Sequence, residues 1–378
     1  MRPLSDCAVN NGRTDNGSPV LLVAEGDGVS SVELSVVIPV LDEALTLPGL
    51  LSDLSAQRKV AFDVLVVDGG SSDNTPTLAE QRLVKLGLSG RVLSSRQGRG
   101  FQLNCGASHA RGEWLLFLHA DSRLPEPCVL RHSLDQLVMR NREGECPVAG
   151  HFSLEFDLGG NPENLAYQFY RAKAHSGRSG TIHGDQGFWI RSVDFESVGR
   201  FREDLPVMED SSFAEDFRRV GEWQLLPGRI VTSTRRFKSE GLIERQTLNA
   251  LMMNFLAIDW LDFVRQAPDL YRRQEQASQL DLLPFFDLIR DLLSQMPVWR
   301  RRALWLATGS YVRSQLWQVG LFLDCRRNQS CWLERFDRWL RPLVNHRIGD
   351  LISAVLIRVW FAWTKNRLRQ KSNRVGSR

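Results

Sequence analysis

The chain has 378 residues, which is long for one domain and short for three. It is 43% hydrophobic and 24% charged, which is ordinary for a globular protein and excludes a fibrous or largely disordered chain. The net charge of +4 is unevenly placed: residues 351–378 hold seven Lys or Arg and no acid, which leaves −3 on the first 350 residues. The basic character belongs to a tail and not to the body of the protein, and we expect no nucleic-acid partner.

Several features of the sequence bear on where the protein resides. Residues 1–32 are rich in Gly, Ser, Asn and Asp, and they predict a disordered leader and not a secretory signal. The six cysteines form no C-x-x-C pair, and we expect reduced thiols in a cytoplasmic protein. The apolar windows 304–323 and 348–363 are interrupted by charged or polar residues, so we expect no transmembrane segment.

From residue 33 onward, apolar strand-like runs alternate with helix-like segments. In chain order we expect a strand ending in Pro39, a helix over 44–57, a strand beginning at 62, a helix ending at 86, a strand over 91–95, a helix over 99–112 and a strand over 113–121. Strands that alternate with helices predict an α/β fold with a mostly parallel central sheet and helices on both faces. Continuous Val, Ile and Leu runs suit strands that are buried on both sides.

The pattern changes after residue 123. We expect an antiparallel strand over 149–157, a helix over 162–175, a short helix near Phe195, a helix over 210–220 and a strand over 224–237. From residue 242 the pattern is helical to the end, with breaks expected at Pro268, Pro284, Pro297 and Pro342. These elements predict a catalytic domain over 33–275 and an all-helical C-terminal extension over 276–378.

Acidic residues follow three of the predicted strands. Asp42 and Glu43 come after the first strand, Asp68 after the second and Asp121 after the fourth. Ligands of open α/β sheets bind outside the carboxyl ends of the strands, so these acids predict a shared pocket that holds ribose hydroxyls or a divalent cation. Turn formation and helix capping are the alternative for each acid taken alone.

Five motifs in order extend this interpretation: "SVVIPVLDE", "VLVVDGGSSDNT", "GRGFQLNCGASHARGEWLLFLHAD", "GDQGFWIR" and "PVMEDSSFAEDFRRVG". Together they resemble a family 2 glycosyltransferase with the GT-A fold, over roughly residues 34–273. More narrowly, they resemble the bacterial branch called radical-SAM/selenodomain-associated transferase 2, some members of which are labelled arsenosugar biosynthesis glycosyltransferases.

The resemblance implies a donor site and a metal site. The donor, a nucleotide-diphosphate sugar, would be bound by Pro39, Asp42, Glu43, Asp68, Arg99, Gly100 and Asn104. The family's Asp-x-Asp motif, which binds the metal and the diphosphate, reads His119-Ala120-Asp121 here. Asp121 keeps the last position, while His119 replaces the first acid and has a helix cap or a hydrogen bond to an acid as its alternative. Either Mg²⁺ or Mn²⁺ is compatible with this pair.

The resemblance also implies an acceptor site and a base. Gly184, Asp185 and Gln186 match the acceptor-side segment, with a plain turn as the alternative. Glu209 and Asp210 match the family's Glu-Asp motif, and Asp210 would take the proton of a hydroxyl acceptor in an inverting displacement. Asp210 also suits a helix N-cap, and the two roles are compatible.

Two other functions stay open. A sugar-phosphate nucleotidyltransferase would need a Gly-rich basic loop after the first strand, where this chain has "VLDEALTL". A catalytically degenerate nucleotide-binding or scaffold protein is supported only by the missing first acid of the metal motif.

A helical stripe of apolar residues precedes the basic tail. Its members are Ile348, Leu351, Ile352, Val355, Leu356, Val359, Trp360 and Trp363. Such a helix packs on its own domain or on a second subunit of a homo-oligomer. The alternative is contact of 348–378 with the inner face of an anionic membrane.

Overall fold

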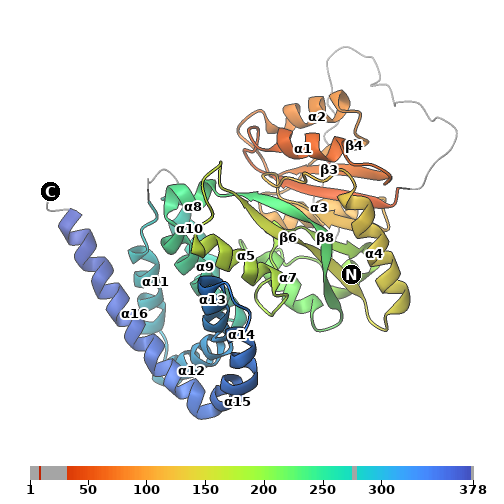
Figure 1. Ribbon diagram of the computed structural model, residues 1–378. Helices are drawn as coiled ribbons and strands as arrows, with labels where there is room; N and C mark the ends of the chain where they lie inside the picture. The colour runs from red at the N-terminus through yellow and green to blue at the C-terminus, as the bar shows by residue number, and fades with distance from the viewer. Residues whose placement is uncertain (1–7, 10–31, 275–278, 376–378) are drawn as a thin grey trace. The chain divides into compact units, whose positions relative to one another are not determined.

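The structure is a computed structural model that describes residues 8–9, 32–274 and 279–375. The chain forms two compact units (Figure 1). The first unit contains residues 1–156, 177–204 and 209–232, and the second contains residues 157–176, 205–208 and 233–378. The domain boundary expected between residues 275 and 276 falls inside the second unit, and the domain boundaries stay a prediction.

An eight-stranded sheet organises the first unit, in the order β1-β4-β3-β2-β5-β7-β6-β8. Its strands are β1 (Ala8–Val9), β2 (Leu34–Val40), β3 (Phe62–Asp68), β4 (Gly90–Ser94), β5 (Trp114–Phe117), β6 (Val148–Asp157), β7 (Phe188–Arg191) and β8 (Glu222–Ser233). The four central strands β4, β3, β2 and β5 are parallel, while β1 pairs antiparallel with β4, and β7 pairs antiparallel with β5 and β6. The short strand β1 lies within the expected leader, so the expectation of disorder is wrong for Ala8–Val9; most of the leader is outside the described residues.

Helices cover both faces of the sheet. The helices of the first unit are α1 (Leu47–Ser55), α2 (Thr75–Lys85), α3 (Arg99–Ser108), α4 (Val129–Glu143), α6 (Ser192–Val198) and α7 (Glu209–Phe217), with a short 3₁₀ turn, η1, at Gly184–Gln186. Val37 and Val67 point toward α3, where Gly106 lets the helix approach so closely that a Cβ there would lie 2.3 Å from Val37 Cγ1. Val36 and Val66 are equally buried and alternate to the opposite face. The expected α/β class, with a mostly parallel centre and a helical C-terminal region, is confirmed.

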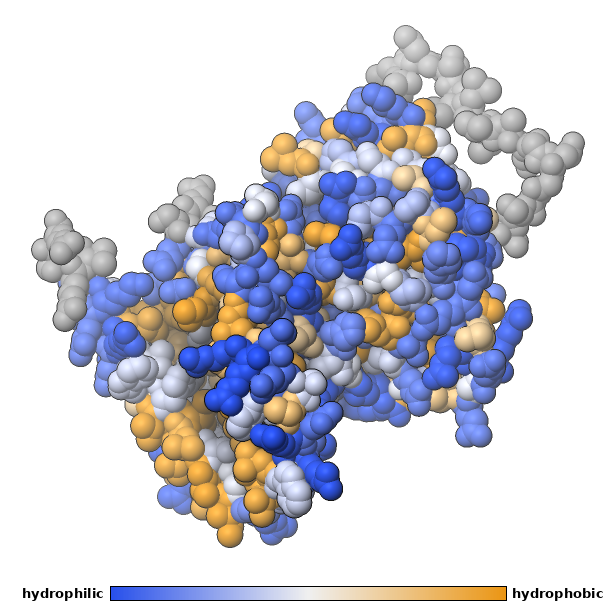
Figure 2. All heavy atoms as spheres, viewed as in Figure 1, coloured by the Kyte–Doolittle hydropathy of each residue, from blue (hydrophilic) through white to orange (hydrophobic). Residues whose placement is uncertain are grey.

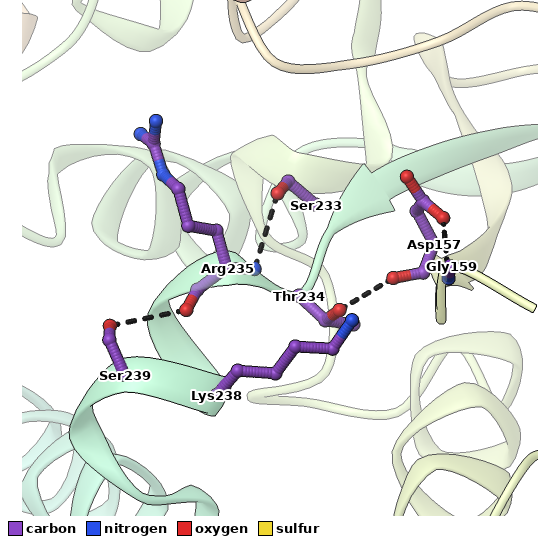
Figure 3. A pocket seen from close by; sticks show the side chains of 7 residues that line it. All are labelled: Asp157, Gly159, Ser233, Thr234, Arg235, Lys238 and Ser239. Atoms are coloured by element: carbon purple, nitrogen blue, oxygen red, sulfur yellow. Dashed lines mark hydrogen bonds between the residues drawn. The ribbon is translucent and has the colours of Figure 1, made fainter. Parts of the chain in front are cut away.

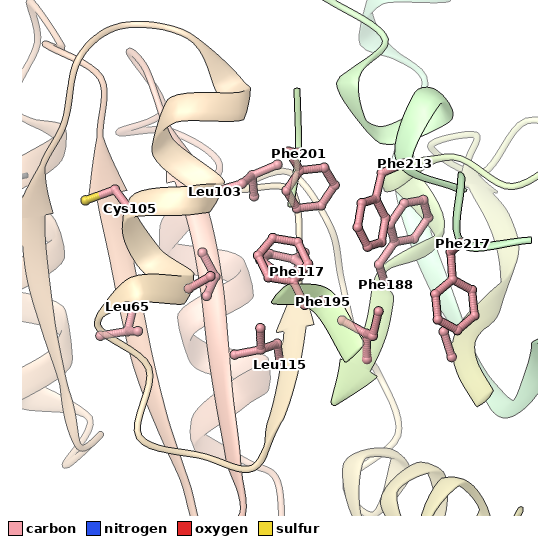
Figure 4. Packing of buried hydrophobic residues seen from close by; sticks show 14 of the residues in the cluster. Leu65, Leu103, Cys105, Leu115, Phe117, Phe188, Phe195, Phe201, Phe213 and Phe217 are labelled. Atoms are coloured by element: carbon pink, nitrogen blue, oxygen red, sulfur yellow. The ribbon is translucent and has the colours of Figure 1, made fainter. Parts of the chain in front are cut away.

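An aromatic core lies between β5, β7 and the helices α3, α6 and α7 (Figure 4). Phe117 from β5 contacts Phe195 and Phe201 with ring centroids 5.1 and 4.9 Å apart. Phe213 from α7 lies 4.8 Å from Phe201 and 5.3 Å from Phe195. These rings attach the start of α7 to the end of β5, and both segments carry predicted site residues.

The second unit is helical. It contains α5 (Leu165–His175), α8 (Arg235–Glu240), α9 (Leu242–Ala257), α10 (Leu261–Arg272), α11 (Leu283–Ser294), α12 (Val298–Ser314), α13 (Trp317–Arg327), α14 (Trp332–Arg335), the π turn η2 (Phe336–Leu340), α15 (Arg341–Val344) and α16 (Arg347–Val375). Its main core is built around Phe255, Trp260, Phe263, Phe285 and Phe286. No helix among the residues that the structure describes is both long enough and apolar enough to cross a bilayer.

A cavity of about 520 Å³ also lies in the second unit (Figure 3). Its lining residues are Asp157, Gly159, Ser233, Thr234, Arg235, Lys238 and Ser239. Thr234 Oγ1 donates to the Asp157 carbonyl at 2.5 Å, and Lys238 Nζ donates to the Leu158 carbonyl at 3.3 Å. These bonds tie the start of α8 to the end of β6, so Thr234 and Lys238 have structural partners.

Three expectations are corrected. The strand expected over 224–237 ends at Ser233, and α8 begins at Arg235. Pro268 does not end a helix but lies inside α10, where buried Phe263 and Val264 hold the helix in the core despite the lost hydrogen bond. Cys105 is disulfide-bonded, so the expectation of reduced thiols is wrong for this residue. Among the described residues, Cys128, Cys146, Cys325 and Cys331 are free.

Candidate active site

The carboxyl ends of the central strands meet at one edge of the sheet. Val40 of β2 is level with Asp68 of β3, and Val37 of β2 is level with Phe117 of β5. Because β5 and β7 are antiparallel and Phe117 pairs with Phe188, the segment after β5 lies beside the segment before β7. The metal motif of residues 119–121 and the acceptor motif of residues 184–187 are therefore neighbours.

Gly184 brings three of the predicted motifs together. Its backbone N–H donates to Asp210 Oδ2 at 2.7 Å. A Cβ at position 184 would lie 2.9 Å from Asp210 Oδ2 and 2.9 Å from His119 Nε2. Because real Cβ atoms essentially never approach other atoms this closely, any other residue at position 184 would force Asp210 or His119 to shift. The glycine therefore allows the strand end, the η1 turn and the start of α7 to converge as they do.

Asp210 lies in the first turn of α7 and not at its N-cap, because the helix begins at Glu209. Asp210 Oδ1 accepts the backbone N–H of Ser211 at 2.6 Å. Burial acts to raise the pKa of Asp210, but Arg99, His183, the Gly184 N–H and His119 outweigh it, and the pKa is lowered. Asp210 is consequently ionised at neutral pH.

Glu209 is in the opposite state. Its side chain is 1% exposed, its two oxygens have no hydrogen-bond partner, and Arg99 Nη1 lies 3.3 Å from Oε1. Burial raises the pKa of Glu209 to about 7, although the Arg99 charge opposes this shift. Arg99, expected to bind the donor, thus lies at the centre of an acidic group.

Asp185 is the second acid with a raised pKa. Burial, followed by the charges of Asp210 and Asp121, raises the pKa of Asp185 to about 7 against the effect of Arg99. Its Oδ1 atom is buried without a hydrogen-bond partner. We call Asp121, Asp185, Glu209, Asp210 and Arg99 the carboxylate cluster. Each of its acids acts electrostatically on Arg99.

The other predicted acids lie at the same sheet edge but are engaged in loop contacts. Asp68 accepts the backbone N–H groups of Gly70 and Ser71, and Asp42 accepts those of Ser72 and Asp73. Glu43 accepts the hydroxyl of Thr46. These bonds shape the loops after β2 and β3, and the donor-binding role of the three acids stays a prediction.

The remaining donor residues have the following surroundings. Pro39 lies near the end of β2, level with Val67. Asn104 is buried, and its amide bonds both the N–H and the carbonyl of Phe201. Gly100 lies so close to the chain that a Cβ would be 2.8 Å from the Arg202 carbonyl. The close contacts of Asn104 and Gly100 fix the start of α3, which carries Arg99.

One residue of the site was not predicted from the sequence. His183 directly precedes the glycine of the acceptor motif, and its Nδ1 hydrogen-bonds with Ser211 Oγ at 2.9 Å. It also helps to lower the pKa of Asp210. Its position beside "GDQG" is the only sequence signal for it. Gln186 is fully buried, with Nε2 donating to the Thr181 carbonyl at 2.8 Å and Oε1 unpartnered.

The acids of the cluster are oxygen ligands of the kind that Mg²⁺ and Mn²⁺ take. Among the described residues, no group of three or more His, Cys, Asp or Glu is arranged to hold a metal by itself. Mg²⁺ in phosphate-transferring sites is usually held by one or two carboxylates together with substrate phosphates and water. The charge of Asp121 helps to raise the pKa of Asp185, and this excess of acids fits a metal ion that arrives with a diphosphate.

Part of the chain is similar to a known protein family. Residues 35–198 match the family Glycosyl transferase family 2. The match covers the part of the chain that contains β2 to α6, including Asp121 and Asp185.

Two curated relatives and one solved structure illustrate the match. The chain is 39% identical over 95 residues to a PGL/p-HBAD biosynthesis glycosyltransferase of Mycobacterium bovis, covering 24% of this chain and 36% of the relative. It is 33% identical over 140 residues to the Drosophila melanogaster dolichyl-phosphate beta-glucosyltransferase, covering 34% and 43%. A mannosyltransferase from Pyrobaculum calidifontis, solved with GDP-Man and Mn²⁺, is 16% identical with a TM-score of 0.44, covering 87% of each chain. The chain thus spans less than half of the length of these two curated relatives.

Proposed function

We propose that the protein transfers a sugar from a nucleotide-diphosphate donor to a hydroxyl acceptor, and that the reaction takes place at the carboxylate cluster. The observation that carries this proposal is the convergence of four acids around Arg99 at the carboxyl edge of the sheet. Two of them have pKa values of about 7, as expected for groups that exchange protons at neutral pH. The family match over residues 35–198 supports the same chemistry.

The proposed reaction is an inverting displacement. The acceptor O–H loses its proton to a carboxylate, its oxygen forms a bond to the anomeric carbon, and the bond from that carbon to the diphosphate breaks. The diphosphate leaves with the electron pair. Asp210 is the proposed base, because it is ionised at neutral pH and is held by the Gly184 N–H.

Asp185 is the second candidate for the proton acceptor. Its unpartnered Oδ1 is free to accept a proton, and a pKa of about 7 suits a base that works near neutral pH. Asp210, with a lowered pKa and hydrogen bonds to both oxygens, is a weaker base but is ionised at neutral pH. The two assignments predict different pH profiles and are separable.

Asp121 and His119 would hold Mg²⁺ or Mn²⁺ together with the donor diphosphate. Such an ion supplies positive charge that stabilises the departing diphosphate. Arg99 is placed to bind the same negative charge directly, and Glu43 and Asp68 are proposed to bind the base and ribose. The narrower assignment to the arsenosugar-labelled branch is supported by the motif resemblance alone.

The test compares Asp210→Asn and Asp185→Asn with Asp216→Asn, a control acid on the same helix that pairs with Arg219. Donor binding is found first, by thermal shift with a panel of nucleotide-diphosphate sugars and either metal. Transfer by the base variant should fall roughly 100-fold or more while donor binding persists. Wild-type-like turnover of Asp210→Asn would reject Asp210 as the base, and the same result for both variants would reject the proposed site.

The same assay addresses the alternatives. A nucleotidyltransferase would release pyrophosphate from a nucleoside triphosphate and a sugar phosphate, and we expect no such release because the loop after β2 is acidic and lacks glycine. A scaffold protein would bind a donor without turning it over. The buried oxygens of Asp185 and Glu209 that lack hydrogen-bond partners weigh against a scaffold. Such groups lower the stability of the fold, and a protein that serves only as a scaffold would not need them.

A further inference from the structure

The C-terminal part of the second unit has an unusual concentration of exposed apolar side chains. Between residues 339 and 363, eleven large hydrophobic residues are exposed (Figure 2, orange near the start of α16). They are Trp339, Leu340 and Leu343 before α16, and Ile348, Leu351, Ile352, Val355, Leu356, Val359, Trp360 and Trp363 on α16. We call these the apolar face. Contiguous exposed apolar surface of this kind marks an interaction site.

The other side of α16 fixes how the helix is held. Ala354 and Lys365 are buried there, and α16 packs along α12 and α11. Gly309 of α12 lies so close that a Cβ would be 2.5 Å from the Asp350 carbonyl. Lys365 Nζ lies 2.8 Å from Asp287 Oδ1. The helix does pack on its own unit, as one alternative expected. Trp360 takes part in that contact, with its ring centroid 5.8 Å from that of Phe286, but the rest of the predicted apolar stripe is more than half exposed.

The charge around the apolar face is positive. No acid follows Asp350 in the chain, and Asp350 itself pairs with Arg313 at 2.6 Å. Arg358, Arg367 and Lys371 are exposed on α16. The Arg367 guanidinium lies 5.3 Å from the Trp363 ring, so a cation and an interfacial aromatic residue occupy the same end of the stripe.

We propose that the apolar face binds the surface of an anionic lipid bilayer, with α16 lying in the plane of the interface. The stripe from residue 348 to 363 is roughly 22 Å long, and its charged flanks suit a helix that lies on a membrane and not one that crosses it. The Trp rings would lie at the headgroup level and the Arg and Lys side chains on lipid phosphates. A second copy of the same face would bring identical uncompensated cations together, which disfavours a dimer as the occupant.

The test is sedimentation of the full chain with phosphatidylcholine vesicles that contain or lack phosphatidylserine. The test variant carries Leu356→Glu and Val359→Glu, and the control carries Val84→Glu and Val220→Glu. All four positions are exposed, so each pair adds the same charge without disturbing a core. Equal thermal unfolding of the two variants and the wild type establishes that both fold.

We expect the wild type and the control to bind anionic vesicles roughly tenfold or more tightly than neutral ones, with weaker binding at high salt. The test variant should lose roughly tenfold or more of this affinity. Equal binding by the test variant, or no binding by the wild type, overturns the proposal. A different result would assign the apolar face to a subunit interface: the wild type is a dimer in sedimentation velocity, the test variant is a monomer, and neither binds vesicles. None of these readouts depends on sugar transfer.

Discussion

Replacing Glu209 by glutamine tests the electrostatics of the carboxylate cluster without removing its shape. Glu209 is almost fully buried, and its Oε1 atom lies 3.3 Å from Arg99 Nη1. Burial raises its pKa from 4.5 to about 7, so the folded protein favours the protonated acid. Glutamine imitates this neutral form at every pH and leaves Arg99 near the three other acids of the cluster.

The size and sign of the effect follow from linkage. A rise in pKa from 4.5 to about 7 corresponds to about 3 kcal/mol in the free energy of unfolding. The favourable contribution of the protonated acid is fully present below about pH 4.5 and is lost as the pH rises to about 7. Glu209→Gln should therefore match the wild type near pH 4.5, gain stability relative to it between about pH 4.5 and 7, and be about 3 kcal/mol more stable at pH 8.

The measurement is urea unfolding of both proteins at pH 5, 6, 7 and 8. The control is Glu80→Gln, which replaces an exposed acid on α2. The control should not change stability at any of these values. Transfer activity of Glu209→Gln should fall even as stability rises, as expected where a site is held in a costly state for function. A variant less stable than the wild type at pH 8, or a difference that is independent of pH, would refute the reasoning.

Two further substitutions test the frame of the site. Gly184→Ala places a methyl group 2.9 Å from Asp210 Oδ2 and His119 Nε2. We expect this variant to lose roughly 1–3 kcal/mol of stability in thermal unfolding and to lose sugar transfer. Near-normal transfer activity would contradict the close approach at position 184. Ser35→Ala removes a buried hydroxyl that donates to Asp63 Oδ1 at 2.6 Å and accepts two backbone N–H groups before β5. The Ser35→Ala variant should lose about 1–3 kcal/mol in its free energy of unfolding, while the folded protein keeps nearly the same affinity for the donor. An unchanged unfolding midpoint would count against this prediction.

The central strands could be predicted because both of their faces are buried. β2, β3 and β5 are continuous apolar runs, a pattern that surface strands do not show. The end of β8 could not be predicted in this way, since residues 234–237 have polar and aromatic side chains that suit either a strand or a helix. Pro268 shows the same limit: a local helix-breaking signal is overridden by burial of its neighbours in the core.

The site was predicted as separate motifs, and their meeting depends on information that no motif contains. The antiparallel pairing of β5 with β7 places His119 next to Gly184, although 65 residues separate them. An N-cap role was also open for Asp210 from the sequence, whereas the helix begins one residue earlier, at Glu209. Asn104 matched a donor-binding position, but its buried amide is bonded to Phe201, a contact across 97 residues.

The acids of the cluster differ in charge because their electrostatic surroundings differ. Arg99, His183 and the Gly184 N–H together outweigh the burial of Asp210 and lower its pKa. For Asp185 and Glu209, burial outweighs Arg99 and their backbone hydrogen bonds, and their pKa values rise to about 7. The balance between burial and nearby positive groups thereby sets which acid is charged and which acids can hold a proton. When the pKa values of neighbouring carboxyl groups are pushed apart, the groups can take different roles in acid–base chemistry. Here Asp210 is ionised beside two acids that can exchange protons near neutral pH.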